Sequence, residues 1–281
     1  MNRILALIIL CLVAIVALAQ QNIAVKYNVS TRNPDNGELV NREMTLVANN
    51  HKSLYFNSMS LYVDSCNSTP EGKARLREIQ MKAWRVVHPD GTVTFDNRKL
   101  GLVPNKNEYL YVKKDADNNI LSVFDYKASN LWRYDEPMGE IAWDIDEDTV
   151  QTFLGLDCIM AETDFHGRHW KVWFAPEVPV SDGPWKLYGL PGIILKAVAD
   201  EGNDFIIEAI EVGTTRQDVP DVYSVNNYER GERKQILSDH EYYINNLESI
   251  LAAKGIKLNG DGSPANLAKY NRKIQAWETD Y

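Results

Sequence analysis

Residues 183–197 read GPWKLYGLPGIILKA, and this stretch decides how the middle of the chain is folded. Proline fixes its own φ at about −65°, so Gly183-Pro184 predicts the start of a turn. Pro191-Gly192 suits the two central positions of a type II turn, which predicts a positive φ at Gly192. The stretch therefore predicts a corner with a turn at each end.

The residues between the two turns predict how the corner is filled. Residues 186–188 predict a short extended segment, and Pro191 pushes the residue before it towards an extended conformation. Trp185 and Leu190 are suited to plug the corner, and the apolar run after it predicts a strand from Ile193. The corner motif comprises six residues: Gly183, Pro184, Gly189, Leu190, Pro191 and Gly192.

A tight hairpin precedes the corner, within residues 155–174. Gly167-Arg168 fits a two-residue loop, with glycine at the first central position that a type II′ turn requires. This loop predicts that Phe165 lies opposite Trp170 on the neighbouring strand. One face of the hairpin is then apolar and is predicted to be core; it carries Ile159, Ala161, Thr163, Phe165, Trp170, Val172 and Phe174.

Strand signals recur along most of the chain. After the corner, residues 192–199 and 205–212 are apolar on both faces, which predicts a hairpin of central strands. Residues 23–29 alternate between apolar and polar side chains, as in a half-buried strand. Further strands are predicted between turn signals at 43–48, 53–63, 82–87, 92–98, 108–113, 120–126, 131–134 and 140–144.

Helix signals are fewer. Thr69, followed by proline and glutamate, predicts a helix start. Apolar residues at helical spacing predict a long helix over about 227–254 with a break near Ser238, where Ser238 and Glu241 resemble a capping box, and with a stop at Gly255. The chain is therefore predicted to be mainly β or α+β. We expect one domain, residues 20–281, with an antiparallel curved sheet or half-barrel and the long helix packed on it.

The N-terminus predicts export. Residues 1–19 hold one charge, Arg3, and an apolar run that ends in small residues, which is typical of a signal peptide cleaved before Gln20. The run, residues 4–19, is shorter than the roughly 20 residues that span a bilayer, so no transmembrane segment is expected after cleavage. We expect the mature chain in the periplasm, on the outer-membrane surface or outside the cell.

Charge and cysteine content narrow the partners. The net charge of −9 disfavours nucleic acid as a partner, and loss of Arg3 would make it −10. Two cysteines, Cys66 and Cys158, remain after cleavage. In an oxidising compartment they are a possible disulfide, and the alternative is two small buried apolar side chains.

Few residues suggest catalysis or metal binding. The predicted hairpin register places His166 opposite His169, but a metal site needs three or four ligands. Cys158 lies too far along the same strand from His166 to use it as a base. The sequence holds no recognised catalytic or nucleotide-binding motif. No catalytic residue, metal or cofactor is therefore assigned.

Aromatic residues are the better candidates for binding. Trp170, Trp173, Trp185 and Tyr188 cluster within nineteen residues around the corner. In a secreted β protein such a cluster can form a ligand groove or a partner surface. The alternative is that these side chains pack in the core and along the sheet edge.

The same region carries a family resemblance. GPWKLYGLPGIILKAVAD resembles the signature of the bacterial GLPGLI family, with Ile193 in place of the leucine of that name. The preceding GLDCIMAETDFHGRHWKVWFAPEVPV resembles the family's usual lead-in. The match covers about residues 155–200. Its residues are Cys158, Gly167, Arg168, Trp170, Trp173, Glu177, Pro179, Gly183, Pro184, Trp185, Gly189, Leu190, Pro191, Gly192 and Ile194. The resemblance implies an exported protein of unknown function, found mainly in Bacteroidota, and supplies no catalytic residues.

These observations favour an exported, non-enzymatic protein that binds a hydrophobic or small ligand or an envelope protein. A secreted hydrolase acting on glycan or peptide is the alternative. It predicts a cleft where two acidic side chains, or Cys158 and a histidine, converge. A structural adaptor at the outer membrane is a third class, and it predicts a large exposed apolar patch.

Overall fold

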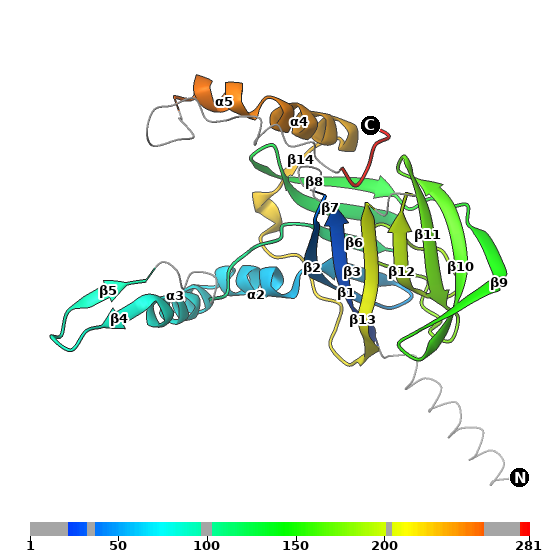
Figure 1. Ribbon diagram of the computed structural model, residues 1–281, viewed down its shortest axis with the longest axis horizontal. Coiled ribbons are helices and arrows are strands. Elements are labelled where there is room, and N and C mark those ends of the chain that lie inside the picture. The colour runs from blue at the N-terminus through cyan, green and yellow to red at the C-terminus, as the bar shows by residue number, and fades with distance from the viewer. Residues whose placement is uncertain (1–21, 33–36, 97–102, 201–203, 256–275) are drawn as a thin grey trace, which may run out of the picture.

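The computed structural model describes residues 22–32, 37–96, 103–200, 204–255 and 276–281. Their central feature is one open sheet of twelve strands (Figure 1). From edge to edge the strands are β14 (Glu229–Arg230), β8 (Asn130–Pro137), β7 (Ile120–Lys127), β6 (Tyr111–Asp115), β3 (Lys52–Phe56), β2 (Leu39–Ala48), β1 (Asn22–Arg32), β13 (Phe205–Thr215), β12 (Ile193–Ala199), β11 (Arg168–Ala175), β10 (Leu156–Phe165) and β9 (Asp144–Phe153).

The predicted β-rich class is confirmed, and the sheet is mixed. Neighbouring strands are antiparallel except β14 and β8, which are parallel. The sheet coils strongly, so β7 and β8 run across the direction of β1 and β12 in Figure 1. Such twist follows from the right-handed twist of each strand. Within the described residues no helix is both long and apolar enough to cross a membrane.

Apolar side chains fill both sides of the sheet. The larger cluster contains Val25, Leu46, Val172 and Ile194, all fully buried, and helix α4 (Arg233–Asn245) adds Ile236 to it. The smaller cluster lies on the other face of β2 and β3, where Val47, Leu54 and Phe56 alternate with the first set. Val219, Val222 and Tyr228 cover it. The two clusters explain why β2 and β3 are apolar on both faces.

An arm of two helices and a small hairpin extends from the sheet (Figure 1). It contains α2 (Ser58–Asn67), α3 (Pro70–Trp84), β4 (Arg85–Val87) and β5 (Val93–Phe95). The predicted helix start at Thr69 is confirmed, because Thr69 Oγ1 accepts a hydrogen bond from the Gly72 amide at 3.0 Å. The predicted strand over 53–63 is wrong after Phe56. Asn57 accepts a hydrogen bond from the Ser60 amide and so starts α2 instead.

The β10–β11 hairpin has its turn one residue earlier than predicted. His166 and Gly167 form the loop with φ of 52° and 77°, as in a type I′ turn. Phe165 therefore pairs with Arg168, and Trp170 lies opposite Thr163. Moving the loop by one residue shifts the pairing by two, which keeps the same side chains on each face. Ala161, Thr163, Trp170, Val172 and Phe174 are accordingly buried, as predicted for the core face.

The corner between β11 and β12 is a narrow loop. The Leu187 amide donates to Pro184 O at 3.1 Å, and Asp182 forms a β-bridge with Tyr188. Trp185, with a φ of 54°, and Lys186 form the turn, so the predicted extended segment over 186–188 is wrong at Lys186 and is confirmed at Tyr188, which forms the β-bridge. Trp185 and Leu190 are buried, which confirms them as plugs.

The predicted positive φ at Gly192 is wrong. Positive φ belongs to Gly189, at 96°. A Cβ atom at Gly192 would lie 2.3 Å from Ala175 O, because the backbone just before β12 lies close to the end of β11. Glycine is therefore required at position 192 by close backbone contact.

The predicted long C-terminal helix is wrong. The described chain has a 3-10 turn, η2 (Val225–Asn227), then β14, α4 (Arg233–Asn245) and α5 (Leu247–Ala253). The break falls at Asn246, while the supposed capping box at Ser238 lies inside α4. Burial of Tyr228 against Phe124 holds the residues before α4 beside the sheet, so the helix starts only at Arg233. The stop at Gly255, with a φ of 71°, is confirmed.

The two cysteines, which the sequence leaves as a possible disulfide or as two buried apolar side chains, are both free and buried. Cys66 packs with Val63 and Leu76 inside the arm. Cys158 lies on β10 in the larger cluster. Each thiol fills space as a small apolar group, which is the alternative reading of the sequence.

Candidate functional site

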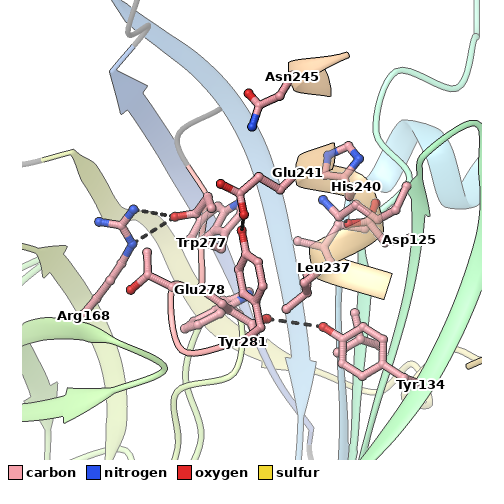
Figure 2. A pocket seen from close by; sticks show the side chains of 16 residues that line it. Asp125, Tyr134, Arg168, Leu237, His240, Glu241, Asn245, Trp277, Glu278 and Tyr281 are labelled. Carbon is pink, nitrogen blue, oxygen red and sulfur yellow. Dashed lines mark hydrogen bonds and ion pairs between the residues drawn. The ribbon is translucent and has the colours of Figure 1, made fainter. Parts of the chain in front are cut away.

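A cavity of about 580 Å³ opens between the sheet, α4 and the C-terminal segment, defined as residues 276–281 (Figure 2). Strands β7 and β8 provide one wall, and α4 packs against both of them. The C-terminal segment provides the opposite wall, with Trp277 and Glu278 among the lining residues. Elements far apart in the sequence therefore build the cavity together.

The lining divides into apolar and polar parts. The apolar side chains that face the cavity are Leu110, Val123, Trp185, Leu237 and Trp277. The polar side chains include Asp125, Lys127, His240, Glu241 and Asn245. Figure 2 shows His240, Glu241 and Asn245 along α4, with Leu237 nearer Trp277 and Tyr134. Arg168, Glu278 and Thr279 also line the cavity near Trp277, so its lining combines apolar and polar side chains.

A stack of aromatic rings supports the part of the cavity wall that Trp185 and Trp277 form. Trp185 lies between Trp170 and Trp277, with ring centroids 5.4 Å and 5.5 Å away. Trp277 also contacts Phe205, at 4.3 Å between centroids. Offset ring contacts at these distances stabilise the packed state. The stack joins β11, the 183–188 loop, the C-terminal segment and β13.

Side chains and backbone groups hold the C-terminal segment in place. Arg168 Nε donates a hydrogen bond to Ala276 O at 3.0 Å, and Nη2 of the same guanidinium donates a second one to the same oxygen. Both are drawn in Figure 2. The Thr279 amide donates to His166 O at 3.0 Å, and Thr279 Oγ1 donates to Gly167 O at 2.8 Å. The turn of the β10–β11 hairpin therefore serves as a binding surface for this segment.

A buried ionic cluster lies beside the stack. Lys186, which is fully buried, forms ion pairs with Glu136 and with Glu278, the latter at 2.9 Å. Arg233 Nε lies 2.5 Å from Glu278 Oε2 and the same side chain pairs with Asp280. Burial raises the pKa of the Glu278 carboxyl, but Lys186, His166 and Arg233 outweigh it and hold that pKa below its usual value. The cluster is thus a charged and internally paired group.

His166 lies at the edge of this cluster. Its Nε2 is 3.5 Å from Glu136, and its Nδ1 is 3.4 Å from Asp280. Burial and the Lys186 ammonium lower the pKa of the His166 ring. The ligand atoms of Glu136, His166 and Glu278 lie within 4.8 Å of one another, close enough to hold a metal ion. However, the Lys186 ammonium already binds both carboxylates and supplies a positive charge there.

The predicted juxtaposition of His166 and His169 is wrong. Because the hairpin turn falls at 166–167, Asp164 lies opposite His169. His169 Nδ1 lies 2.9 Å from Asp164 Oδ1 on an exposed part of the hairpin. The two histidines therefore have different partners and do not form a shared site.

The four predicted binding aromatics do not form one surface. Trp185 lines the cavity, and Trp170 stacks behind it. Trp173 alternates to the other face of β11 and packs against Phe153, with centroids 6.1 Å apart. Tyr188 donates to Gly139 O at 2.8 Å, on the loop before β9. Only Trp185 of the four belongs to the lining of this cavity.

Sequence reasoning missed most of the residues that build the site. Lys186 was treated as an ordinary member of an extended segment, and Glu136 and Arg233 carried no motif. For the C-terminal segment the sequence predicts no more than a last extended segment or a frayed end. Trp277 was the available signal, because a tryptophan in a polar tail requires a place to pack.

Comparison with known proteins gives one family match. Residues 143–196 match a family described as "Protein of unknown function (Porph_ging)". This region includes most of the stretch that resembles the GLPGLI signature and agrees with it. No curated protein shows detectable sequence similarity to the chain.

The structure is also similar to solved structures of PNGF-II, in a P21 and in a C2 crystal form. Each comparison gives a TM-score of 0.49 and 16% identity, and covers 78% of this chain. The chain spans about a third of the length of those proteins, 33% and 32% respectively. What the sequence comparison establishes is that residues 143–196 are similar to a family of unknown function.

Proposed function

We propose that this chain is an exported, non-enzymatic binding protein of the cell envelope, and that its cavity takes a small amphiphilic ligand. The observation that carries the proposal is the cavity of about 580 Å³ whose lining combines apolar and polar side chains. Sites for small molecules commonly measure roughly 300–1,000 Å³ and combine apolar walls with a few polar groups. The apolar part of the ligand would lie against Trp277 and Leu237.

His240 would provide a defined hydrogen bond to the polar part of the ligand. Its Nδ1 accepts a hydrogen bond from the Ala128 amide at 3.1 Å. Burial, with a smaller effect of Lys127, lowers the pKa of His240 to about 4, so the ring is neutral at pH 7. A neutral ring that accepts at Nδ1 carries its proton at Nε2. The ligand group best suited to this donor is a neutral acceptor, such as a carbonyl, ether or hydroxyl oxygen.

The hydrolase alternative has one observation in its favour. Glu136 and Glu278 converge beside the cavity, as paired catalytic carboxylates do. However, Lys186 binds both of them, and the pKa of Glu278 is lowered. A general acid needs a raised pKa so that it holds a proton near neutral pH. These features support a structural role for the pair.

Cys158 also fits a structural role better than a nucleophilic one. Burial raises the pKa of its thiol to about 11. A reactive cysteine usually has a lowered pKa and an electropositive surrounding. The thiol donates to Leu156 O at 3.6 Å, within its own strand.

Ligand binding can be tested with the neutral fluorescent amphiphile N-phenyl-1-naphthylamine. We expect saturable one-to-one binding, with blue-shifted emission, to the wild-type chain. Leu237→Trp places a larger side chain in the cavity and is expected to weaken binding at least about tenfold. Tyr242→Trp, at a position 65% exposed on the same helix, is the matched control and retains binding. Equal binding to both variants, or none to the wild type, would reject the cavity as the site.

Export is tested separately by the N-terminus of the protein isolated from its native cells. Cleavage before Gln20 predicts an intact mass that corresponds to residues 20–281. A cytoplasmic protein that retains residues 1–19 would contradict the envelope assignment while leaving ligand binding to be judged by the amphiphile titration.

A further inference from the structure

We propose that the groove filled by the C-terminal segment is a peptide-binding site, and that residues 276–281 are its intramolecular occupant. The site is then suited to an extended segment of a partner protein that carries a tryptophan followed by acidic residues. This goes beyond the small-ligand cavity, because the groove holds residues 276–281 themselves; it shares Arg168 and Trp185 with the cavity lining, while Lys186, Arg233 and Phe205 belong to the groove and not to that lining.

The groove forms hydrogen bonds with the main chain of the segment and also contacts its side chains. Arg168 donates to Ala276 O, and Thr279 donates its amide proton to His166 O. Both contacts involve the main chain of the segment, and the described part of the segment pairs with no strand of the sheet. Main-chain recognition of an extended segment provides affinity, and side-chain pockets provide specificity.

One side-chain pocket selects an aromatic residue. Trp277 lies between Trp185 and Phe205, with centroids 5.5 Å and 4.3 Å away. Arg168 also lies over the Phe205 ring, 4.7 Å from its centroid, which fixes the floor of this pocket. Buried aromatic anchors of this kind dominate the affinity of many interfaces.

The second pocket selects acidic residues. Arg233 pairs with Glu278 and Asp280, and Lys186 pairs with Glu278. Without the C-terminal segment, the carboxylate of Glu136 alone would face the two cations Lys186 and Arg233 within this cluster. The pocket that takes Glu278 therefore has an excess of positive charge, although the whole chain is acidic. An acidic segment of a partner would neutralise Lys186 and Arg233 in the same way as Glu278 and Asp280 do.

Tethering makes the intrinsic segment a strong competitor. A covalently attached segment has an effective concentration on the order of millimolar, so a free peptide binds weakly while the segment is docked. Weakening the anchor of the tethered segment should therefore reveal binding in trans. Trp277→Ala removes that anchor and leaves all groove residues in place.

The test uses the full chain and a fluorescein-labelled peptide, AWETDY, with the sequence of residues 276–281. Fluorescence anisotropy should show that Trp277→Ala binds this peptide at least about tenfold more tightly than the wild type does. The peptide AAETDY, and AWKTKY with reversed charges, should each bind at least about tenfold more weakly than AWETDY. Folding of the variant is checked by its cooperative thermal unfolding.

A second measurement keeps the proposal testable if Trp277→Ala does not fold. Hydrogen exchange of the wild-type chain should show the C-terminal segment opening without global unfolding, at least about tenfold faster than the amides of β1 and β13. Exchange of this segment only through global unfolding would overturn the proposal. So would a folded Trp277→Ala chain that binds AWETDY no better than AAETDY. Loss of amphiphile binding alone would bear on the cavity and not on the groove.

Discussion

Lys186 Nζ lies 2.9 Å from Glu278 Oε1, and this ion pair joins the tip of the 183–188 loop to the C-terminal segment. The loop thus does more than deliver the chain into β12. It places a buried cation where carboxylates from β8 and from the C-terminal segment meet. The corner predicted from its turn residues is at the same time part of the candidate site.

Lys186→Met is expected to destabilise the fold strongly. It leaves the carboxylates of Glu136 and Glu278 in a buried place without their shared ammonium, and loss of one partner of a buried pair costs about 3–5 kcal/mol. Thermal or denaturant unfolding measures the loss. The control is Lys26→Met, which breaks an exposed pair with Glu211 and should change the melting temperature little. Equal changes in the two variants would contradict a structural role for Lys186.

Gly192→Ala is expected to lower the free energy of unfolding by about 2 kcal/mol or more. The new Cβ would lie 2.3 Å from Ala175 O, and both backbones belong to the sheet, so neither can move freely. Gly213→Ala is the control, since a Cβ there meets no atom within 4 Å. Denaturant unfolding of the two variants measures the difference. Two variants of equal stability would show that β11 and β12 are not in such close contact.

The stability of the fold should fall on acidification, in part through His240. The pKa of this ring is about 4 in the folded chain and about 6.5 when it is exposed. Between these values the unfolded chain binds a proton that the folded chain does not. The contribution of His240 is therefore complete above about pH 6.5 and is lost as the pH falls towards 4, by about 2 kcal/mol after reduction for partial exposure.

His240→Asn keeps an acceptor near the position of Nδ1 and removes the titration. Melting temperatures measured from pH 7 to pH 4 should decline less steeply for this variant than for the wild type. His166, whose pKa is also lowered, still titrates in both proteins and leaves a residual slope. Parallel curves for variant and wild type would contradict the buried, neutral state of His240.

Both Cys66 and Cys158 should be free thiols. Without reductant, native protein should react slowly with a thiol reagent, because both side chains are buried. After unfolding in guanidinium, peptide mapping should find both cysteines alkylated. A peptide pair joined by a Cys66–Cys158 disulfide would contradict the arrangement that places one in the arm and one in the sheet.

Local patterns predicted much of the sheet correctly. The two-residue period of β10 and β11 identifies their buried face, and that face survives the error in the turn because a one-residue move of the loop shifts the register by two. Turn residues alone could not place the loop. Its first central residue is His166, which adopts a left-handed φ of 52° although it is not a glycine. Arg168 is fixed in the strand by distant partners, Asp200 and Ala276.

The site depended on long-range contacts that no local pattern carries. Lys186 is buried because Glu136, fifty residues earlier, and Glu278, near the end of the chain, converge on it. The helical period covers only Ile236 to Leu251, and the prediction extends the helix back to residue 227 beyond it. Packing of Tyr228 against Phe124 holds the chain beside the sheet there, and α4 starts at Arg233. Tertiary contacts therefore determine where the helix starts and where Lys186 lies, because the local conformational preference there is weak.

The proposed ligand site between the sheet, α4 and the C-terminal segment can be tested on the native protein. Native mass spectrometry of the chain purified from its own cell envelope is the sharpest test. We expect a bound small molecule at one copy per chain in the wild type and in Tyr242→Trp, and its absence from Leu237→Trp. Retention of the same molecule by Leu237→Trp, or a wild-type chain that carries none and also binds no amphiphile, would contradict it.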